Sequence, residues 1–271
     1  MRNRKEKGTG MDHQNYIVTE KCSEIRRQAR KHLKGLWLQV SIGIALYIVM
    51  LGFIPELFNT VIPLGQYTQT LPNGQTVTIS TVAQLYGMFM TGVFSVGLAS
   101  FMLSICRHRD ANPTHIFDGF EFYVRAFTLS VVKSIFIMLW TMLFIIPGIV
   151  AIYRYYMAEY ILAEDPRKGA FQCIRESKQL MKFNKMKLFL LQLSFIGWSI
   201  LASVPIVFCV WWLRPDPSSA TYLIMEFFLL IPAYVLGAYN KVAETVFYEI
   251  LTAPYRQQRT PPQTTDLSQW G

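Results

Sequence analysis

The chain has 271 residues, of which 52% are hydrophobic and only 16% charged, against about 25% charged in soluble domains. The apolar residues gather in long runs, and residues 57–106 contain no Lys, Arg, Asp or Glu. This pattern excludes an ordinary soluble domain and predicts an integral membrane protein. The net charge is +9, but the basic residues flank the apolar runs, so we expect a membrane surface, and no nucleic acid, as partner.

The N-terminal region is basic. Residues 1–19 are polar and are predicted to form a disordered basic tail. From Ser23 onward, Ile25, Ala29 and Leu33 recur on one helical face, which predicts a basic helix lying in the membrane interface. A solvated charged helix is the alternative. The cations that we expect at the membrane surface are Arg26, Arg30 and Lys34.

Two spans follow, at about 36–54 and 82–106, with Pro55 expected to end the first. The loop between them lacks Lys and Arg, so it is expected outside the cell, with a turn at Asn73-Gly74. Small residues spaced four apart in the second span predict close helix packing. They are Gly87, Thr91, Ser95 and Ala99.

Metal and disulfide sites are not indicated. The spacing of His108, Asp110, His115 and Asp118 matches no established ligand pattern, so no metal is expected. The four cysteines are widely separated, which favours free thiols. The motifs of common hydrolases, P-loop proteins and dinucleotide-binding enzymes are absent, so neither a cofactor nor a catalytic residue is predicted.

The longest apolar stretch, 128–162, is interrupted by Pro147-Gly148. A bilayer core of about 30 Å needs about 20 helical residues, so one straight helix of 35 residues would overshoot it by about 20 Å. Pro lacks an N–H and Gly tolerates positive φ, so the pair is the predicted turn. We therefore expect two antiparallel spans, at about 128–146 and 149–163.

A second basic helix is predicted at 167–183, with Asp165 as its N-cap and Asn184 as the left-handed residue that ends it. Its membrane-surface cations are Arg175, Lys178 and Lys182.

The last two spans are expected at about 188–213 and 222–251, followed by a flexible tail at 253–271. Lys and Arg concentrate on alternate loops, which places both termini in the cytoplasm. The predicted fold is an all-α bundle of six transmembrane helices in one domain, 20–252, with two or three amphipathic interfacial helices on the cytoplasmic side.

The run LWTMLFIIPGIVAIYRYYMAEYILAEDP, with IRESKQLMKFNKMKLFLLQLSFIGW after it, resembles one family of bacterial integral membrane proteins, known as domain of unknown function 975. The N-terminal SEIRRQARKHLKGLW and the later VFYEILT resemble the same family, so the likeness covers about 23–252. Two positions depart from its pattern, Phe183 for Gly and Ala238-Tyr239 for Pro-Tyr. More distantly, the hairpin and basic helix resemble the membrane domain attached to some glycerophosphodiester phosphodiesterases. The resemblance implies a bacterial cytoplasmic membrane and carries no catalytic residues.

Charged residues inside predicted spans are candidate sites, because burying them in a bilayer is costly. Arg154 and Glu226 are expected at similar depths, and we hypothesise that they are in contact. Structural pairing is favoured over substrate binding. Nearer the inner side, Lys133 and Glu159 are expected to face each other across the hairpin at comparable depth, with Lys241 and Glu244 nearby.

These features favour a non-catalytic bundle that interacts with anionic cytoplasmic headgroups, with a protein partner or with a second copy of itself. The alternative is a transporter or exporter component with a polar site around Arg154 and Glu226. An enzyme has no motif in its support.

Overall fold

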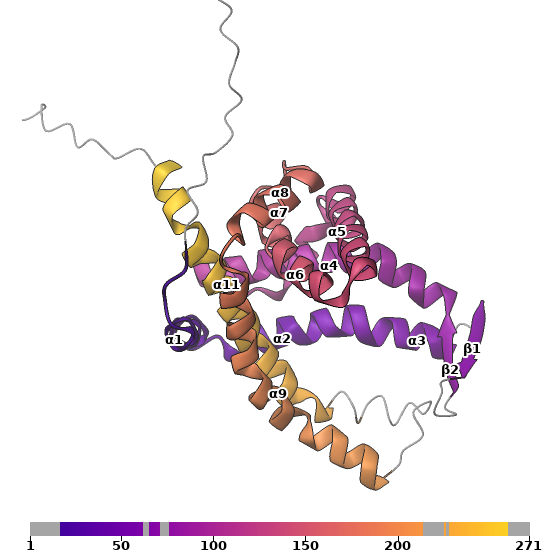
Figure 1. Ribbon diagram of the computed structural model, residues 1–271. Helices are drawn as coiled ribbons and strands as arrows, with labels where there is room; N and C mark the ends of the chain where they lie inside the picture. The colour runs from indigo at the N-terminus through magenta and orange to yellow at the C-terminus, as the bar shows by residue number, and fades with distance from the viewer. Residues whose placement is uncertain (1–16, 62–64, 71–75, 214–224, 226–227, 260–271) are drawn as a thin grey trace, which may run out of the picture.

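The computed structural model describes residues 17–259, except 62–64, 71–75, 214–224 and 226–227. Several predictions fall outside the described residues. They concern the turn at Asn73-Gly74, the charged residue Glu226 and most of both predicted tails. The described chain is mainly helical (Figure 1). Four of its helical segments are long and apolar enough to cross a membrane, which confirms a helical membrane fold: Trp37–Asn59, Thr81–His108, Tyr123–Leu143 and Lys185–Cys209.

The first helix, α1 (Cys22–Leu33), packs its apolar residues inside the protein. Ile25, Ala29 and Leu33 are fully buried, and α1 lies against α11 (Ile231–Arg259) and α9 (Lys185–Leu213). The helix begins one residue before the predicted cap, Ser23.

The first candidate span does not end at Pro55, as the sequence predicted. It continues through α2 (Trp37–Ile48), the π-helical η1 (Val49–Phe53) and α3 (Ile54–Val61). Proline removes a helical N–H and crowds the carbonyl four residues earlier, and the wider π turn just before it gives that ring room. The chain then forms an antiparallel hairpin of β1 (Gln66–Thr70) and β2 (Thr76–Ser80).

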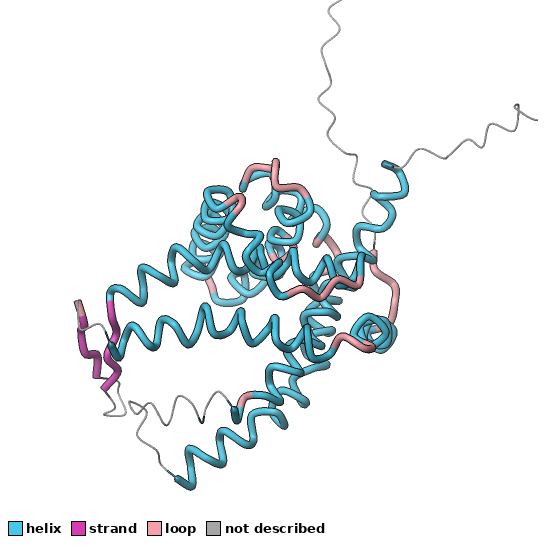
Figure 2. The backbone as a smooth tube through the Cα atoms, turned by 180° about the vertical axis from the view of Figure 1, so that it is seen from behind, coloured by secondary structure: helices cyan, strands magenta, loops and turns pink. Residues whose placement is uncertain are grey.

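The central helix is α4 (Thr81–His108), which runs beside α2 and α3 from the β-hairpin inward (Figure 2). A 3₁₀ segment, η2 (Pro113–Phe120), lies along it. A Cβ atom on Gly97 would lie 1.8 Å from the Ile116 carbonyl oxygen, and one on Gly92 would lie 2.6 Å from the Ala126 oxygen. These close approaches therefore use glycines outside the predicted stripe. Within the stripe, Gly87 meets nothing within 4 Å, whereas Ala99 is buried.

The predicted reversal in the longest apolar stretch is present, but it is displaced. Helices α5 (Tyr123–Leu143) and α6 (Ile145–Tyr155) pack together on either side of Phe144, whose backbone is extended. Pro147 and Gly148 lie in the first turns of α6 instead of forming the turn. Pro147 suits this position because the first helical N–H groups lack helical partners anyway. A Cβ on Gly148 would lie 2.3 Å from Thr141 Oγ1, so glycine permits the close packing of the hairpin.

The predicted fourth span, 149–163, is divided between α6 and a short helix, α7 (Ala158–Glu164). The second basic helix is α8 (Ala170–Leu180), which starts later than predicted because the Asp165 carboxylate accepts from the Arg167 N–H in a turn. The left-handed residue after it is Phe183 (φ +71°), and not Asn184. The Asn184 side chain instead accepts from the Val18 N–H at 2.9 Å.

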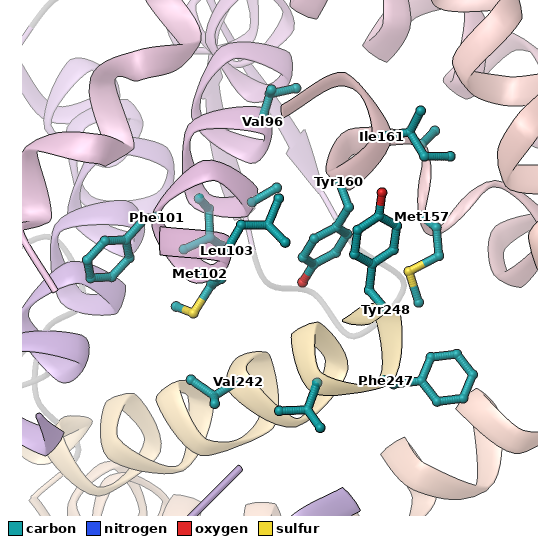
Figure 3. Packing of buried hydrophobic residues seen from close by; sticks show 14 of the residues in the cluster. Val96, Phe101, Met102, Leu103, Met157, Tyr160, Ile161, Val242, Phe247 and Tyr248 are labelled. Atoms are coloured by element: carbon teal, nitrogen blue, oxygen red, sulfur yellow. The ribbon is translucent and has the colours of Figure 1, made fainter. Parts of the chain in front are cut away.

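The last helix, α11, continues past residue 252 through Pro254 to Arg259, so the first part of the predicted tail is helical. Figure 3 shows the core that α4, α7 and α11 build around Met102, Tyr160 and Tyr248. The two tyrosine rings stack with centroids 5.2 Å apart. This core packs the short helix α7 against the two long helices α4 and α11.

Candidate functional site

Polar side chains from three segments form one connected group around the buried Glu244, named here the Glu244 cluster: Tyr153, Tyr156, Gln192, Lys241 and Glu244. The Glu244 side chain is only 1% exposed. The Gln192 amide donates to Glu244 Oε1 at 2.7 Å, and its oxygen accepts from the Tyr153 hydroxyl at 2.9 Å. Lys241 Nζ donates to Glu244 Oε2 at 2.9 Å and to the Tyr156 hydroxyl at 3.0 Å. Both carboxylate oxygens are therefore satisfied, which is what a buried charge requires.

A second charged pair joins the arms of the hairpin. Lys133 Nζ on α5 donates to Glu159 Oε1 on α7 at 2.6 Å, and the two side chains are 19% and 22% exposed. Lys133 and Glu159 were predicted to face each other across the hairpin, and in the structure they are in contact. Lys241 and Glu244, which were expected nearby, belong to the separate Glu244 cluster.

Arg154, at the end of α6, is half-buried and faces the other arm of the hairpin. Its guanidinium carbon lies 5.5 Å from the centre of the Trp140 ring on α5, and its backbone oxygen accepts from the Ser177 hydroxyl on α8 at 3.0 Å. Glu226, its hypothesised partner, lies outside the described residues, so that pairing stays a prediction.

A third network was not predicted, and it ties α4, α7 and the end of α11 together. Arg107 donates to Glu164 at 3.0 Å and to Glu249 at 2.9 Å, while Arg256 pairs with both carboxylates. The Tyr248 hydroxyl donates to Glu164 Oε2 at 2.6 Å. The partners of Arg107 lie 57 and 142 residues away in the sequence, so only the tertiary fold reveals them.

The carboxyl of Glu164 shows how this network balances charge. Burial by itself would raise its pKa, because a carboxylate loses hydration. The Tyr248 hydrogen bond and the charges of Arg107 and Arg256 outweigh burial and hold the pKa below its usual value. Glu164 is therefore ionised at neutral pH and acts as a fixed anion between two arginines.

The basic face of α1 points away from the protein body. Arg27, Arg30, Lys31 and Lys34 are exposed, whereas Arg26 is half-buried and reaches the Ser194 carbonyl. Arg30 also donates to the Tyr239 hydroxyl on α11 at 2.6 Å, which fixes α1 against the bundle.

The α8 region is arranged in the same way. Cys173, Ile174 and Ser177 are buried toward the bundle, while the predicted surface cations are exposed: Arg175, Lys178 and Lys182. The amine of Lys182 lies 5.3 Å from the centre of the exposed Phe183 ring. Neither basic helix has its apolar face free, because each face is covered by protein.

The remaining candidates for chemistry are His115 with its neighbouring carboxylates and the buried Cys173. No group of three or more metal-ligating side chains is found within the described residues. His115 bridges Asp110 and Asp118, with a ring nitrogen 3.0 Å from each carboxylate. Burial raises the pKa of the Cys173 thiol to about 12, so it stays protonated and unreactive at neutral pH.

Comparison with known families completes this description. A family described as a protein of unknown function (DUF975) matches residues 19–154 and 144–254, which together span nearly the whole described chain. The chain belongs to the DUF975 family. No curated protein and no solved structure matches this DUF975 protein. The more distant likeness to phosphodiesterase membrane domains stays a prediction.

Proposed function

We propose that this DUF975 protein is a non-catalytic, multi-pass protein of the bacterial cytoplasmic membrane, with both termini in the cytoplasm. The exposed basic surfaces of α1 and α8 bind anionic headgroups on that side. The observation that carries the proposal is the burial of both apolar faces inside the bundle. Since those faces are not free to insert among acyl chains, the outward charges remain as the means of binding.

The charge balance on the two helices supports this function. On α1, Glu24 offsets one cation through its pair with Arg27 at 2.9 Å, and no ion pair within the described part of the chain involves the other basic residues of the helix. On α8, Glu176 pairs with Lys168 at 2.6 Å and leaves Arg175 and Lys178 free to face an anionic surface. Each cation close to such a surface contributes about 1 kcal/mol of attraction.

The position of the helices supports the orientation. Each basic helix immediately precedes a candidate span, α1 before α2 and α8 before α9. Lys and Arg next to the ends of spans favour the cytoplasmic side. The two basic surfaces then belong to the same face of the membrane.

The test uses the full-length protein in neutral detergent, with phosphatidylglycerol or phosphatidylcholine added to equal concentration. Phosphatidylglycerol is expected to raise the midpoint of thermal unfolding more than phosphatidylcholine, because a ligand of the folded state stabilises it. The quadruple variant K31Q/K34Q/R175Q/K178Q should show a smaller difference between the two lipids.

The matched control is K31R/K34R/R175K/K178R, which keeps every charge and should behave as the wild type. Equal stabilisation by the two lipids, or a full response of the neutralised variant, would show that these surfaces do not bind anionic headgroups.

A second candidate function, as a transporter component, draws support from the Glu244 cluster. A carboxylate that is 1% exposed, held by a lysine of the same helix, α11, and by a glutamine of α9, is the kind of group that proton-coupled carriers use. Proteoliposomes loaded with a pH-sensitive dye test it under a potassium diffusion potential. Proton flux above that of protein-free vesicles, abolished by Glu244→Gln, is the result expected of a transporter. The same rate with and without protein would leave the cluster a structural one.

A further inference from the structure

A groove lies between α6 and the start of α9. It has a volume of about 370 Å³ and is lined mainly by apolar side chains from both helices: Ile149, Val150, Tyr153, Phe183, Lys185, Met186 and Phe189. Met186 is 65% exposed, Phe183 61% and Ile149 48%. Apolar side chains this exposed on a membrane protein face acyl chains.

Cations gather at this groove. Lys185 lines it directly, and Arg154 follows the lining residue Tyr153 on α6. Lys182 stacks its amine on Phe183, another lining residue. Lys185 is also the first residue of α9, where the positive end of the helix dipole adds to the field.

Within the described residues these charges have no acidic partner. Glu226, the partner predicted for Arg154, lies outside them. The described contacts of Arg154 are the Trp140 ring and a backbone hydrogen bond, and no carboxylate within the described ranges pairs with Arg154 or Lys185. Two like charges held together beside an apolar surface repel each other and are stabilised by an anion between them. An anion that carries an apolar chain fits both the cations and the apolar side chains of this groove.

We propose that this groove binds one anionic glycerophospholipid. An acyl chain lies along Ile149, Met186 and Phe189, and the phosphate lies between Arg154 and Lys185. Charge-assisted hydrogen bonds from a guanidinium and an ammonium to phosphate are stronger than neutral ones. A zwitterionic lipid is disfavoured because its headgroup cation would lie against the same positive charges. This site does not rest on the proposed function, which uses residues of α1 and α8.

The experiment measures binding of a soluble short-chain phosphatidylglycerol to the full-length protein in neutral detergent, by native mass spectrometry, beside phosphatidylcholine of the same chain length. Wild type should bind phosphatidylglycerol in preference. The variant R154Q/K185Q should bind it about tenfold more weakly, the loss expected when about 1.4 kcal/mol of charge-assisted bonding is removed. Met186→Trp, which fills the groove but keeps its charge, should weaken binding of both lipids.

Three controls separate the outcomes. R154K/K185R keeps the charge and should retain binding within about threefold, while the single variant Lys185→Gln covers the case in which the double variant does not fold. K31Q/K34Q/R175Q/K178Q should leave this binding unchanged. Wild-type affinity in folded R154Q/K185Q, or equal binding of the two lipids by wild type, overturns the proposal. Loss of binding in the quadruple variant alone would overturn it too and would move the lipid to the α1 and α8 surfaces.

Discussion

Helices α4 and α9 have the same mean hydropathy, 1.8, yet they hold opposite places in the molecule. In α4, 61% of the most apolar window is buried inside the protein, whereas in α9 the share is 11%. Hydropathy measures the preference for leaving water, and lipid and protein satisfy that preference equally well. What separates the two helices is the shape of their surfaces.

Glycine positions make this difference visible. Gly97 on α4 faces the backbone of η2 so closely that an added Cβ would overlap the Ile116 carbonyl, while Gly197 on α9 meets nothing within 4 Å. Small residues at a helix crossing allow backbones to approach and gain van der Waals contact. The same residue type on a lipid-facing helix is only a weak helix former. The same substitution is therefore expected to destabilise the protein on α4 and to have little effect on α9.

The largest effect is expected from Gly97→Ala. The new methyl would lie 1.8 Å from a backbone oxygen, so η2 must move away from α4. Overpacking of this kind costs about 3 kcal/mol. Thermal unfolding in detergent, followed by circular dichroism, measures the change. Gly197→Ala is the matched control and should be neutral or slightly stabilising because alanine favours a helix. Similar unfolding midpoints for both variants would mean that η2 does not pack on α4 as described.

A second pair concerns large side chains. Phe101 on α4 is fully buried and contacts Gly43 on α2, whereas Phe208 on α9 is 61% exposed. Phe101→Ala leaves a cavity and should lower the free energy of unfolding by about 2 kcal/mol. This is less than in a soluble core, because the unfolded helices remain in detergent. Phe208→Ala should change it by less than about 0.5 kcal/mol, since detergent fills the space. Equal losses from the two truncations would indicate that α9 is covered by protein, as in a dimer.

These pairs also show which parts of the fold the sequence could predict. The apolar runs that became α2–α3, α4, α5 and α9 were found, because length and the absence of charge are local properties. The chain reversal was found within three residues, and Pro147 marked the beginning of α6 instead of the turn. The prediction that Pro55 ends the first span was wrong because a local π turn makes room for the proline ring, and no sequence pattern predicts such a turn.

In the candidate site, too, contacts within one hairpin were predicted and contacts between distant segments were missed. The pairing of Lys133 with Glu159 was predicted because both lie on arms of one hairpin at similar distances from the turn. The network of Arg107 with Glu164 and Glu249 was missed, since it depends on how α4, α7 and α11 pack. The close approach of η2 to α4 was not predicted either, because it depends on tertiary packing.

The comparison extends to charges. Glu244 lies where α11 meets α9, with its side chain 1% exposed, while Glu24 on the outer face of α1 pairs with a 61% exposed Arg27. Glu244→Ala leaves Lys241 and Gln192 without their acceptor and should destabilise the protein by about 1 to 2 kcal/mol, since Lys241 is partly exposed. Glu24→Ala should cost less than about 0.5 kcal/mol, as exposed pairs do. Chemical denaturation in mixed micelles measures both, and an equal cost would argue against a buried acceptor at Glu244.

The smallest effect tests η2 through pH. The hydrogen bond to Asp110 raises the pKa of His115, burial opposes it, and Asp118 adds to the rise. A pKa raised in the folded state gives stability that is complete below the ordinary value of about 6.5 and is lost as pH rises through the folded value. The free energy of unfolding should therefore fall slightly between about pH 6 and pH 8. The change is less than about 1 kcal/mol because His115 is about one-third exposed. His115→Gln should remove this dependence, and His108→Gln, at an exposed position, should keep it. A pH profile unchanged by His115→Gln would mean that the two carboxylates do not hold His115, and η2 would then be kept on α4 by packing, as at Gly97 and Gly119.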